Sequence, residues 1–153
     1  MSSFAAASDE SHAIKCELAS EVLRLSGRLR FQATGWSMLP AIRPGDLLTV
    51  EHAQGEIAEG EIVLFSRDRR LFAHRVIAGE RSSVTTRGDS MACPDLPLSR
   101  DQVLGRLVCI MRNGKTIRPG RGMSLSDRAV AGLLRRSDFA ARVAARVHNF
   151  ISD

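Results

Sequence analysis

A serine held on a short, restricted loop is the first residue of this sequence that could do chemistry. Residues 34–40 read TGWSMLP, so Ser37 follows Gly35 by two positions and precedes Pro40 by three. Proline fixes its own φ angle, and loops on a rigid scaffold often carry catalytic groups. A serine hydroxyl is a weak nucleophile by itself, so nucleophilic catalysis requires a base within hydrogen-bond distance.

His74 is the strongest candidate for that base. It lies in residues 71–77, LFAHRVI, a pattern typical of a strand, in which the two-residue period puts Phe72, His74 and Val76 on one face. A half-buried histidine that only satisfies backbone groups is the structural alternative. The remaining histidines are expected to be exposed polar residues: His12, His52 and His148.

Two carboxylates follow in a turn that contains glycine. Residues 87–95 read RGDSMACPD and place Asp89 and Asp95 six positions apart. A carboxylate can complete a serine–histidine pair, because it fixes the histidine tautomer and stabilises the imidazolium. The sequence therefore offers candidates for a nucleophile, a base and an orienting acid.

The elements that must position these residues are mainly β strands between two helices. Apolar residues at three- and four-residue steps predict a helix over residues 10–30, with Gly27 fraying its end. Runs rich in Val, Leu, Ile and Phe predict strands at 47–51, 61–66, 71–78, 83–86 and 103–112, the last turning at Asn113-Gly114. We therefore expect an α+β chain with an N-terminal tail and helix (1–30), a β domain (31–120) and a C-terminal helix (121–153).

Length and composition exclude several classes of protein. A chain of 153 residues with 44% hydrophobic and 25% charged residues is long enough for one folded domain, and neither disorder nor a fibrous repeat fits it. The longest run without a charge, 31–42, is too short to span a membrane, and residues 1–8 do not resemble an export signal. Three cysteines without C-x-x-C spacing argue against a disulfide framework or a zinc site, so a reducing cytoplasm is expected.

The basic charge is concentrated at the C-terminus. Residues 106–153 carry 10 basic and 3 acidic residues, a net charge of +7, whereas residues 1–105 carry 12 basic and 14 acidic residues, a net charge of −2. The predicted C-terminal helix opens with Ser124 and Asp127 in a capping pattern, and it gathers arginines on one arc and apolar residues on the other side. The apolar side could pack on the β domain or a partner protein, or it could rest on a membrane surface.

The order of these motifs resembles that of the type I signal peptidases. The resemblance is carried by Ser-Met-x-Pro at 37–40 with Gly-Asp at 45–46, GEIVLF at 60–65, HRVI at 74–77, and Gly-Asp at 88–89 followed by Asp95. It continues weakly through 103–106 and covers about half of the chain. Most bacterial members, like the related self-cleaving SOS repressors, have a lysine at the position of His74, so this chain is similar to the endoplasmic-reticulum and archaeal branch, which has histidine.

The resemblance implies a signal-peptidase-like β-barrel or coiled-sheet domain and a role for each candidate residue. Ser37 would be the nucleophile, His74 the general base and then the acid, and Asp95 the orienting carboxylate, with Asp89 a supporting or structural acid. A histidine base needs less burial than a lysine base, because its pKa starts near 6.5 and not near 10.4. No metal or organic cofactor is implied.

The residues around the nucleophile would shape its loop and the oxyanion site. The family often has a serine two positions before the nucleophile, whereas this chain has Gly35, so the Ser37 N–H needs another donor, for which the Thr34 hydroxyl is the candidate. Trp36 either shapes a substrate pocket or anchors the loop. Met38 either packs inward or touches a substrate side chain, and Pro40 restricts the loop.

The sequence therefore predicts a cytoplasmic serine endopeptidase that cuts a peptide or precursor protein after small residues. The substrate would bind as an extended strand, and the C-terminal helix is the candidate contact for a membrane surface or a partner protein. A non-catalytic peptide-binding or regulatory module on the same fold is the alternative. Nucleic acid is not an expected partner, because a single N-terminal helix does not make a helix-turn-helix motif.

Overall fold

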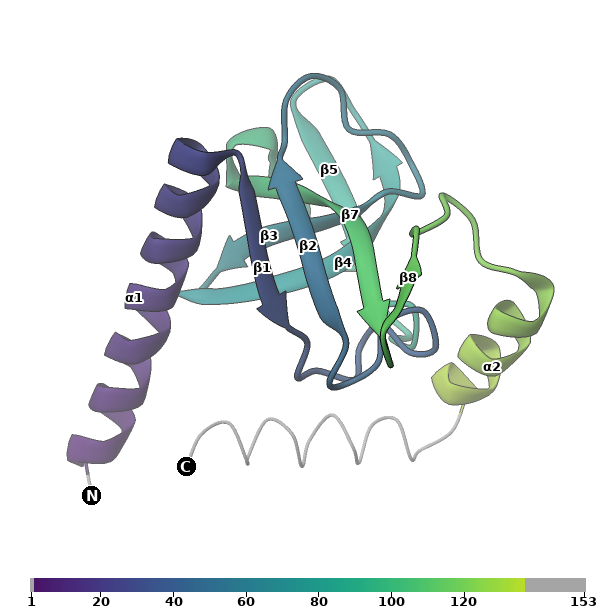
Figure 1. Ribbon diagram of the computed structural model, residues 1–153, viewed down its shortest axis with the longest axis horizontal. Coiled ribbons are helices and arrows are strands. Elements are labelled where there is room, and N and C mark those ends of the chain that lie inside the picture. The colour runs from purple at the N-terminus through teal and green to yellow at the C-terminus, as the bar shows by residue number, and fades with distance from the viewer. Residues whose placement is uncertain (1, 137–153) are drawn as a thin grey trace.

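The computed structural model describes residues 2–136 of the chain, and side chains from residue 10 onward. Its helices are α1 (Ser2–Ser26), the 3-10 helix η1 (Arg100–Gln102) and α2 (Leu125–Arg136). Its strands are β1 (Arg28–Gln32), β2 (Leu47–His52), β3 (Ile62–Arg67), β4 (Arg70–Gly79), β5 (Ser83–Arg87), β6 (Leu98–Ser99), β7 (Val103–Arg112) and β8 (Lys115–Ile117). The two longer helices flank the strands on opposite sides (Figure 1).

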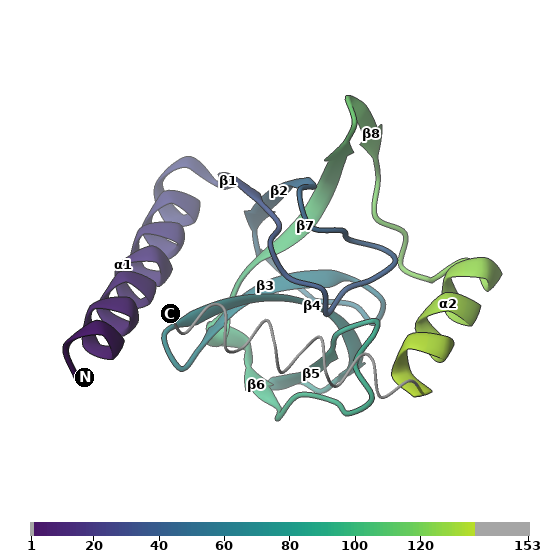
Figure 2. The same ribbon diagram turned by 90° about the horizontal axis from the view of Figure 1, so that it is seen from below.

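The strands form one antiparallel sheet in the order β1-β2-β7-β3-β4-β5-β6, with β8 paired to β7. The pairing register shifts at 49–50, 64–65 and 76–78. Such irregularities bend and twist a sheet, and here the sheet coils around itself (Figure 2). The expected mainly-β domain between two helices is confirmed, and within residues 2–136 the sheet stays open because β1 and β6 remain unpaired ends and do not close a barrel.

Strand β3 separates two apolar cores. Its residues 62–65 are all buried, and the two-residue period of a strand sends Ile62 and Leu64 into one core and Val63 and Phe65 into the other. The first core also contains Leu23 of α1. The second core lies between β3, β4, β5 and β6, on the face of β4 that carries His74.

Helix α1 packs one face on the sheet and ends where the chain must turn into β1. Cys16, Ala19 and Leu23 are buried at three- and four-residue steps. Gly27 has φ 73° and donates its N–H to the carbonyl of Leu23 at 2.9 Å, which is the left-handed helix end that glycine favours. The expected helix over 10–30 is therefore wrong at both ends, because α1 already begins at Ser2 and residues 28–30 belong to β1. Neither α1, with 25 residues, nor the other described helices are apolar enough to cross a membrane.

The C-terminal part of the structure begins with a tight hairpin and ends with α2. Asn113 and Gly114 have φ 50° and 75°, as a type I′ turn requires, and they connect β7 to β8. Ser124 caps α2, since its hydroxyl accepts the N–H of Asp127 at 3.1 Å. Of the helix expected over 121–153, the structure shows Leu125–Arg136, and residues 137–153 lie outside the described residues.

Candidate active site

The Ser37 loop is fixed to the turn that carries Asp89. Ser90 donates its N–H to the carbonyl of Ser37 at 3.0 Å and its hydroxyl to the carbonyl of Trp36 at 2.9 Å. Gly88 lies under the loop so closely that a Cβ atom there would stand 2.6 Å from the Ser37 carbonyl oxygen and 3.0 Å from the Ser37 Cβ. The loop and the turn can therefore meet only because position 88 has no side chain.

The far side of the same loop is anchored in the first core and by an ion pair. Met38 is buried there with 3% exposure, which settles that it packs inward, whereas Trp36 is 45% exposed. Asp46 accepts the N–H of Arg43 at 2.8 Å and two bonds from Arg112, at 2.9 and 2.6 Å. Burial raises the pKa of Asp46, but the bonds from Arg112 and Arg43 outweigh it and hold the pKa below its ordinary value.

His74 reaches Ser37 from β4. Its Nε2 atom lies 3.0 Å from the Ser37 Oγ atom, and its Nδ1 atom lies 2.7 Å from Asp95 Oδ2. The ring is 5% exposed and packs against the rings of Phe65 and Phe72, each with centroids 5.8 Å away. These aromatic contacts fix the plane of the imidazole on the face of β4 that the two-residue period predicts.

Asp95 is held by backbone and side-chain bonds to Thr86. The Asp95 N–H donates to the Thr86 carbonyl at 2.8 Å, and the buried Thr86 hydroxyl donates to Asp95 Oδ2 at 2.7 Å. Burial raises the pKa of Asp95, but the hydrogen bonds from His74 and Thr86 outweigh it, so the pKa is lowered and the carboxylate stays ionised. An ionised Asp95 accepts the Nδ1–H of His74, which leaves the Nε2 lone pair facing Ser37.

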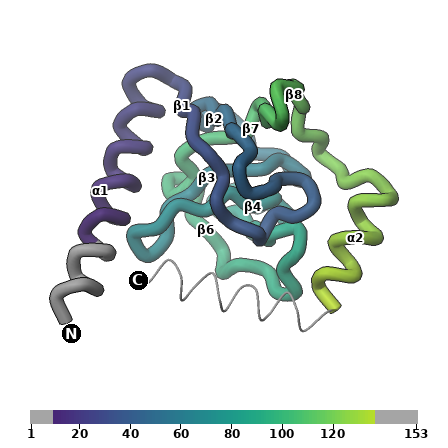
Figure 3. The backbone as a smooth tube through the Cα atoms, turned by 60° about the horizontal axis from the view of Figure 1, so that its bottom comes forward, coloured from purple at the N-terminus to yellow at the C-terminus, as the bar shows by residue number. Residues whose placement is uncertain are grey.

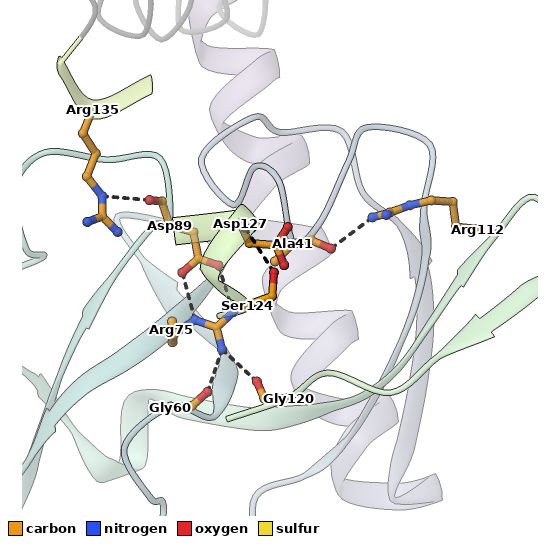
Figure 4. Close-up of polar contacts among 9 residues, drawn as sticks. All are labelled: Ala41, Gly60, Arg75, Asp89, Arg112, Gly120, Ser124, Asp127 and Arg135. Carbon is orange, nitrogen blue, oxygen red and sulfur yellow. Dashed lines mark hydrogen bonds and ion pairs between the residues drawn. The ribbon is translucent and has the colours of Figure 1, made fainter. Parts of the chain in front are cut away.

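Asp89 is not part of this chain of bonds, because its carboxylate is taken up by Arg75. The guanidinium donates to both carboxylate oxygens, at 2.9 and 2.8 Å, and Arg75 and Asp89 are both buried (Figure 4). Arg75 also donates to the carbonyls of Gly60 and Gly120, each at 2.9 Å. Asp89 is thus the charged partner of Arg75, and Arg75 joins three separate segments of the chain at this point.

The same arrangement of a serine, a histidine and a carboxylate occurs in serine peptidases. The sequence matches the Peptidase S24-like family over residues 4–108, about two thirds of the chain. This chain belongs to the Peptidase S24-like family. It is therefore a protein of the serine-peptidase type, and the match contains Ser37, His74 and Asp95. No curated protein matches the sequence significantly.

Several groups that support the site in this S24-like protein were not anticipated from the sequence. They are Arg75, Thr86, Ser90 and, from α2, Arg135, whose Nε–H donates to the carbonyl of Asp89 at 2.9 Å (Figure 4). Arg75 and Ser90 directly follow His74 and Asp89 in the sequence, and that adjacency is the one signal that could have singled them out. Thr86 and Arg135 give no such signal, because their partners are set by tertiary structure.

The other candidate positions of the S24-like protein lie around this centre. Thr34 and Gly35 are exposed, three and two positions before Ser37, and Pro40 is half-buried. Of the remaining histidines, His52 is exposed as expected, whereas His12 is half-buried because it lies one turn before Cys16 on the packed face of α1. His148 lies outside the described residues. Within residues 2–136, no three His, Cys, Asp or Glu side chains lie together in a way that could hold a metal ion.

Proposed function

We propose that this S24-like protein is a serine endopeptidase of the signal-peptidase type, with Ser37 as nucleophile, His74 as base and Asp95 as orienting carboxylate. The observation that carries the proposal is the continuous chain of bonds from Ser37 Oγ to His74 Nε2 and from His74 Nδ1 to Asp95, at 3.0 and 2.7 Å. These two hydrogen bonds connect three segments that are far apart in the sequence, and each of the three side chains is held in place by further contacts.

The proposed reaction moves one proton between Ser37, His74 and the leaving amine. His74 Nε2 takes the proton of the Ser37 hydroxyl while Oγ attacks the carbonyl carbon of the scissile peptide bond. Asp95 stabilises the resulting imidazolium, which then protonates the leaving nitrogen as the C–N bond breaks. A water molecule then attacks the acyl-enzyme ester while His74 Nε2 takes one of its protons. The ester C–O bond breaks, His74 returns the proton to Ser37 Oγ, and the new carboxyl end is released.

The oxyanion of the tetrahedral intermediate is proposed to bind at the exposed end of the Ser37 loop. The Ser37 N–H would be one donor and the Thr34 hydroxyl the other. A Cβ atom at Gly35 would meet no other atom within 4 Å, so the space above the loop is open to a substrate carbonyl. Gly35 therefore leaves room at this point without supplying a donor.

The substrate is proposed to be an extended peptide or precursor protein with small residues before the cut. Thr34 and Gly35 take part in no hydrogen bond between residues 2 and 136, so their backbone groups are free to pair with an extended chain. The preference for small side chains rests on the resemblance to the signal peptidases. The proposed location is the cytoplasm, on the grounds of the cysteine pattern.

The experiment that tests the proposal compares wild type with Ser37→Ala on two kinds of reagent. The first is a fluorophosphonate, which bonds to an activated serine without needing to resemble the substrate. The second is a library of extended peptides with Ala-x-Ala segments, whose products are read by mass. Ser82→Ala is the matched control, since Ser82 is an exposed serine in the β4–β5 loop.

Labelling and cleavage by wild type and Ser82→Ala, and neither by Ser37→Ala, are the expected results. Unchanged cleavage by Ser37→Ala would reject the assignment. Peptide binding without labelling or turnover by wild type would favour the non-catalytic module, for which the missing donor at Gly35 is the supporting observation.

A further inference from the structure

Helix α2 turns an apolar stripe away from the β domain. Leu125 and Leu133 are 83% and 71% exposed, and Val130 is 45% exposed. Steps of four residues place Leu125, Ala129 and Leu133 along one side of the helix. A contiguous exposed apolar stripe is typical of a surface that contacts a membrane or another protein.

The opposite side of α2 is already occupied, so the stripe cannot turn inward without breaking contacts. Ala131 is completely buried, and Arg135 donates to the carbonyl of Asp89 at 2.9 Å. Both views of the fold show α2 at the edge of the molecule, on the side away from α1 (Figures 2 and 3). The helix is thus fixed with its apolar stripe outward.

Among the described residues, which end at position 136, the exposed charged side chains beside the stripe are all arginines. Arg128 and Arg136 are exposed on α2, and the side chain of Arg121, just before the helix, is 72% exposed. Asp127, the acidic residue of α2, is half-buried on the inner side. Helix α1 differs, because its exposed Ile14 and Leu18 are accompanied by exposed glutamates at positions 17 and 21.

We propose that the outer face of α2 docks on an anionic lipid bilayer. A bilayer offers both things that this face needs, which are negative headgroups for the arginines and an apolar layer for Leu125 and Leu133. A second copy of the chain would bring like charges together at this face. Nucleic acid would satisfy the arginines and leave the leucines in water.

Docking through this face would place the candidate active site beside the lipid. Arg135 reaches the carbonyl of Asp89, and Asp89 follows Gly88, on which the Ser37 loop rests. The lipid would therefore lie about one helix diameter, roughly 10 Å, from the turn that supports the nucleophile. The docking proposal itself does not depend on peptidase activity.

The test measures co-sedimentation of the full chain with vesicles of phosphatidylcholine alone and of phosphatidylcholine with about one quarter phosphatidylserine. Three double variants are compared with wild type: Leu125→Ser with Leu133→Ser, Arg128→Ala with Arg136→Ala, and, as the matched control on α1, Ile14→Ser with Leu18→Ser. Circular dichroism checks that each variant keeps its helices.

Wild type is expected to bind the phosphatidylserine vesicles and not the phosphatidylcholine vesicles. The α2 leucine variant should bind at least about 10-fold more weakly and the arginine variant roughly 25-fold more weakly, whereas the α1 variant binds like wild type. The proposal is overturned if wild type ignores anionic vesicles at low salt, or if the leucine variant, still helical, binds as well as wild type. It is also overturned if duplex DNA is bound through the arginines while the vesicles are not.

Discussion

Replacing Gly88 by alanine should disable the site while leaving the fold in place. The new Cβ atom would stand 2.6 Å from the Ser37 carbonyl oxygen, 3.0 Å from the Ser37 Cβ and 2.7 Å from the Met91 Cγ. Met91 is exposed and can move aside, whereas the backbone of Ser37 must shift as a whole. The clash therefore acts on Ser37, the proposed nucleophile.

The size of the effect follows from these distances. Restoring an ordinary contact of about 3.4 Å requires Ser37 to move by about 0.8 Å. The Ser37 Oγ to His74 Nε2 distance of 3.0 Å would then approach 3.8 Å, beyond hydrogen-bond range. A misplacement of this size costs about 100-fold in rate. Stability should fall by about 1–3 kcal/mol, the usual cost of overpacking.

The assay is kcat/KM on a peptide that wild type cleaves, together with urea unfolding followed by circular dichroism. Gly122→Ala is the matched control, because Gly122 is exposed outside the candidate site, its Cβ would meet nothing within 4 Å, and activity should stay within about threefold of wild type. Full activity in a folded Gly88→Ala variant would refute the reasoning. An equal loss in Gly122→Ala would also refute it, since the effect would then not come from the close approach at Gly88.

Three further substitutions test the site and its supports. Thr86→Val removes the hydrogen bond from the Thr86 hydroxyl to Asp95 and so raises the lowered pKa of Asp95. Stability that comes from a lowered pKa is lost as the pH falls through that pKa, so acid unfolding of this variant should begin at a higher pH than in wild type. Thr86→Ser keeps a hydroxyl and should restore the wild-type acid stability. Asp46→Asn should destabilise the chain by about 3 kcal/mol in urea, because it leaves the Arg112 guanidinium without a charged partner; an unchanged midpoint would contradict this. Gly35→Ser adds a hydroxyl in open space beside the proposed oxyanion site, and an increase in kcat of about 10-fold is expected, whereas a decrease would place the oxyanion elsewhere.

The strands that the sequence predicted well are those whose burial follows a local pattern. The five predicted strands are present as β2, β3, β4, β5 and β7, with ends within one residue of those expected. Strand β1 was missed because Leu29 continues the four-residue steps of α1, so the helical pattern hides the two-residue pattern of Leu29 and Phe31. Strands β6 and β8 have two and three residues, too few for any period to be seen.

The candidate site shows the same division between local and tertiary information. Ser37, His74 and Asp95 could be selected from the sequence because each lies in a distinctive motif, and their catalytic roles remain predictions. Their contact could not be derived, since 37 and 21 positions separate the bonded pairs and the coiling of the sheet brings them together. In the sequence, Thr86 has the pattern of an ordinary strand residue. Its contact with Asp95 depends on how the loop after β5 folds back over the strand, which the local sequence does not determine.

The two-sided burial of β3 has a consequence for how the base is held. His74 is the direct pairing partner of Val63, a completely buried residue at the centre of the sheet. The amide hydrogens of such a strand exchange with solvent only when the whole domain opens, and local fraying does not reach them. The imidazole therefore projects from a strand that pairs with the buried centre of the sheet, while the serine it faces lies on a loop beside exposed residues. Any local movement that changes the distance between Ser37 and His74 is then expected to come from the Ser37 loop and not from β4.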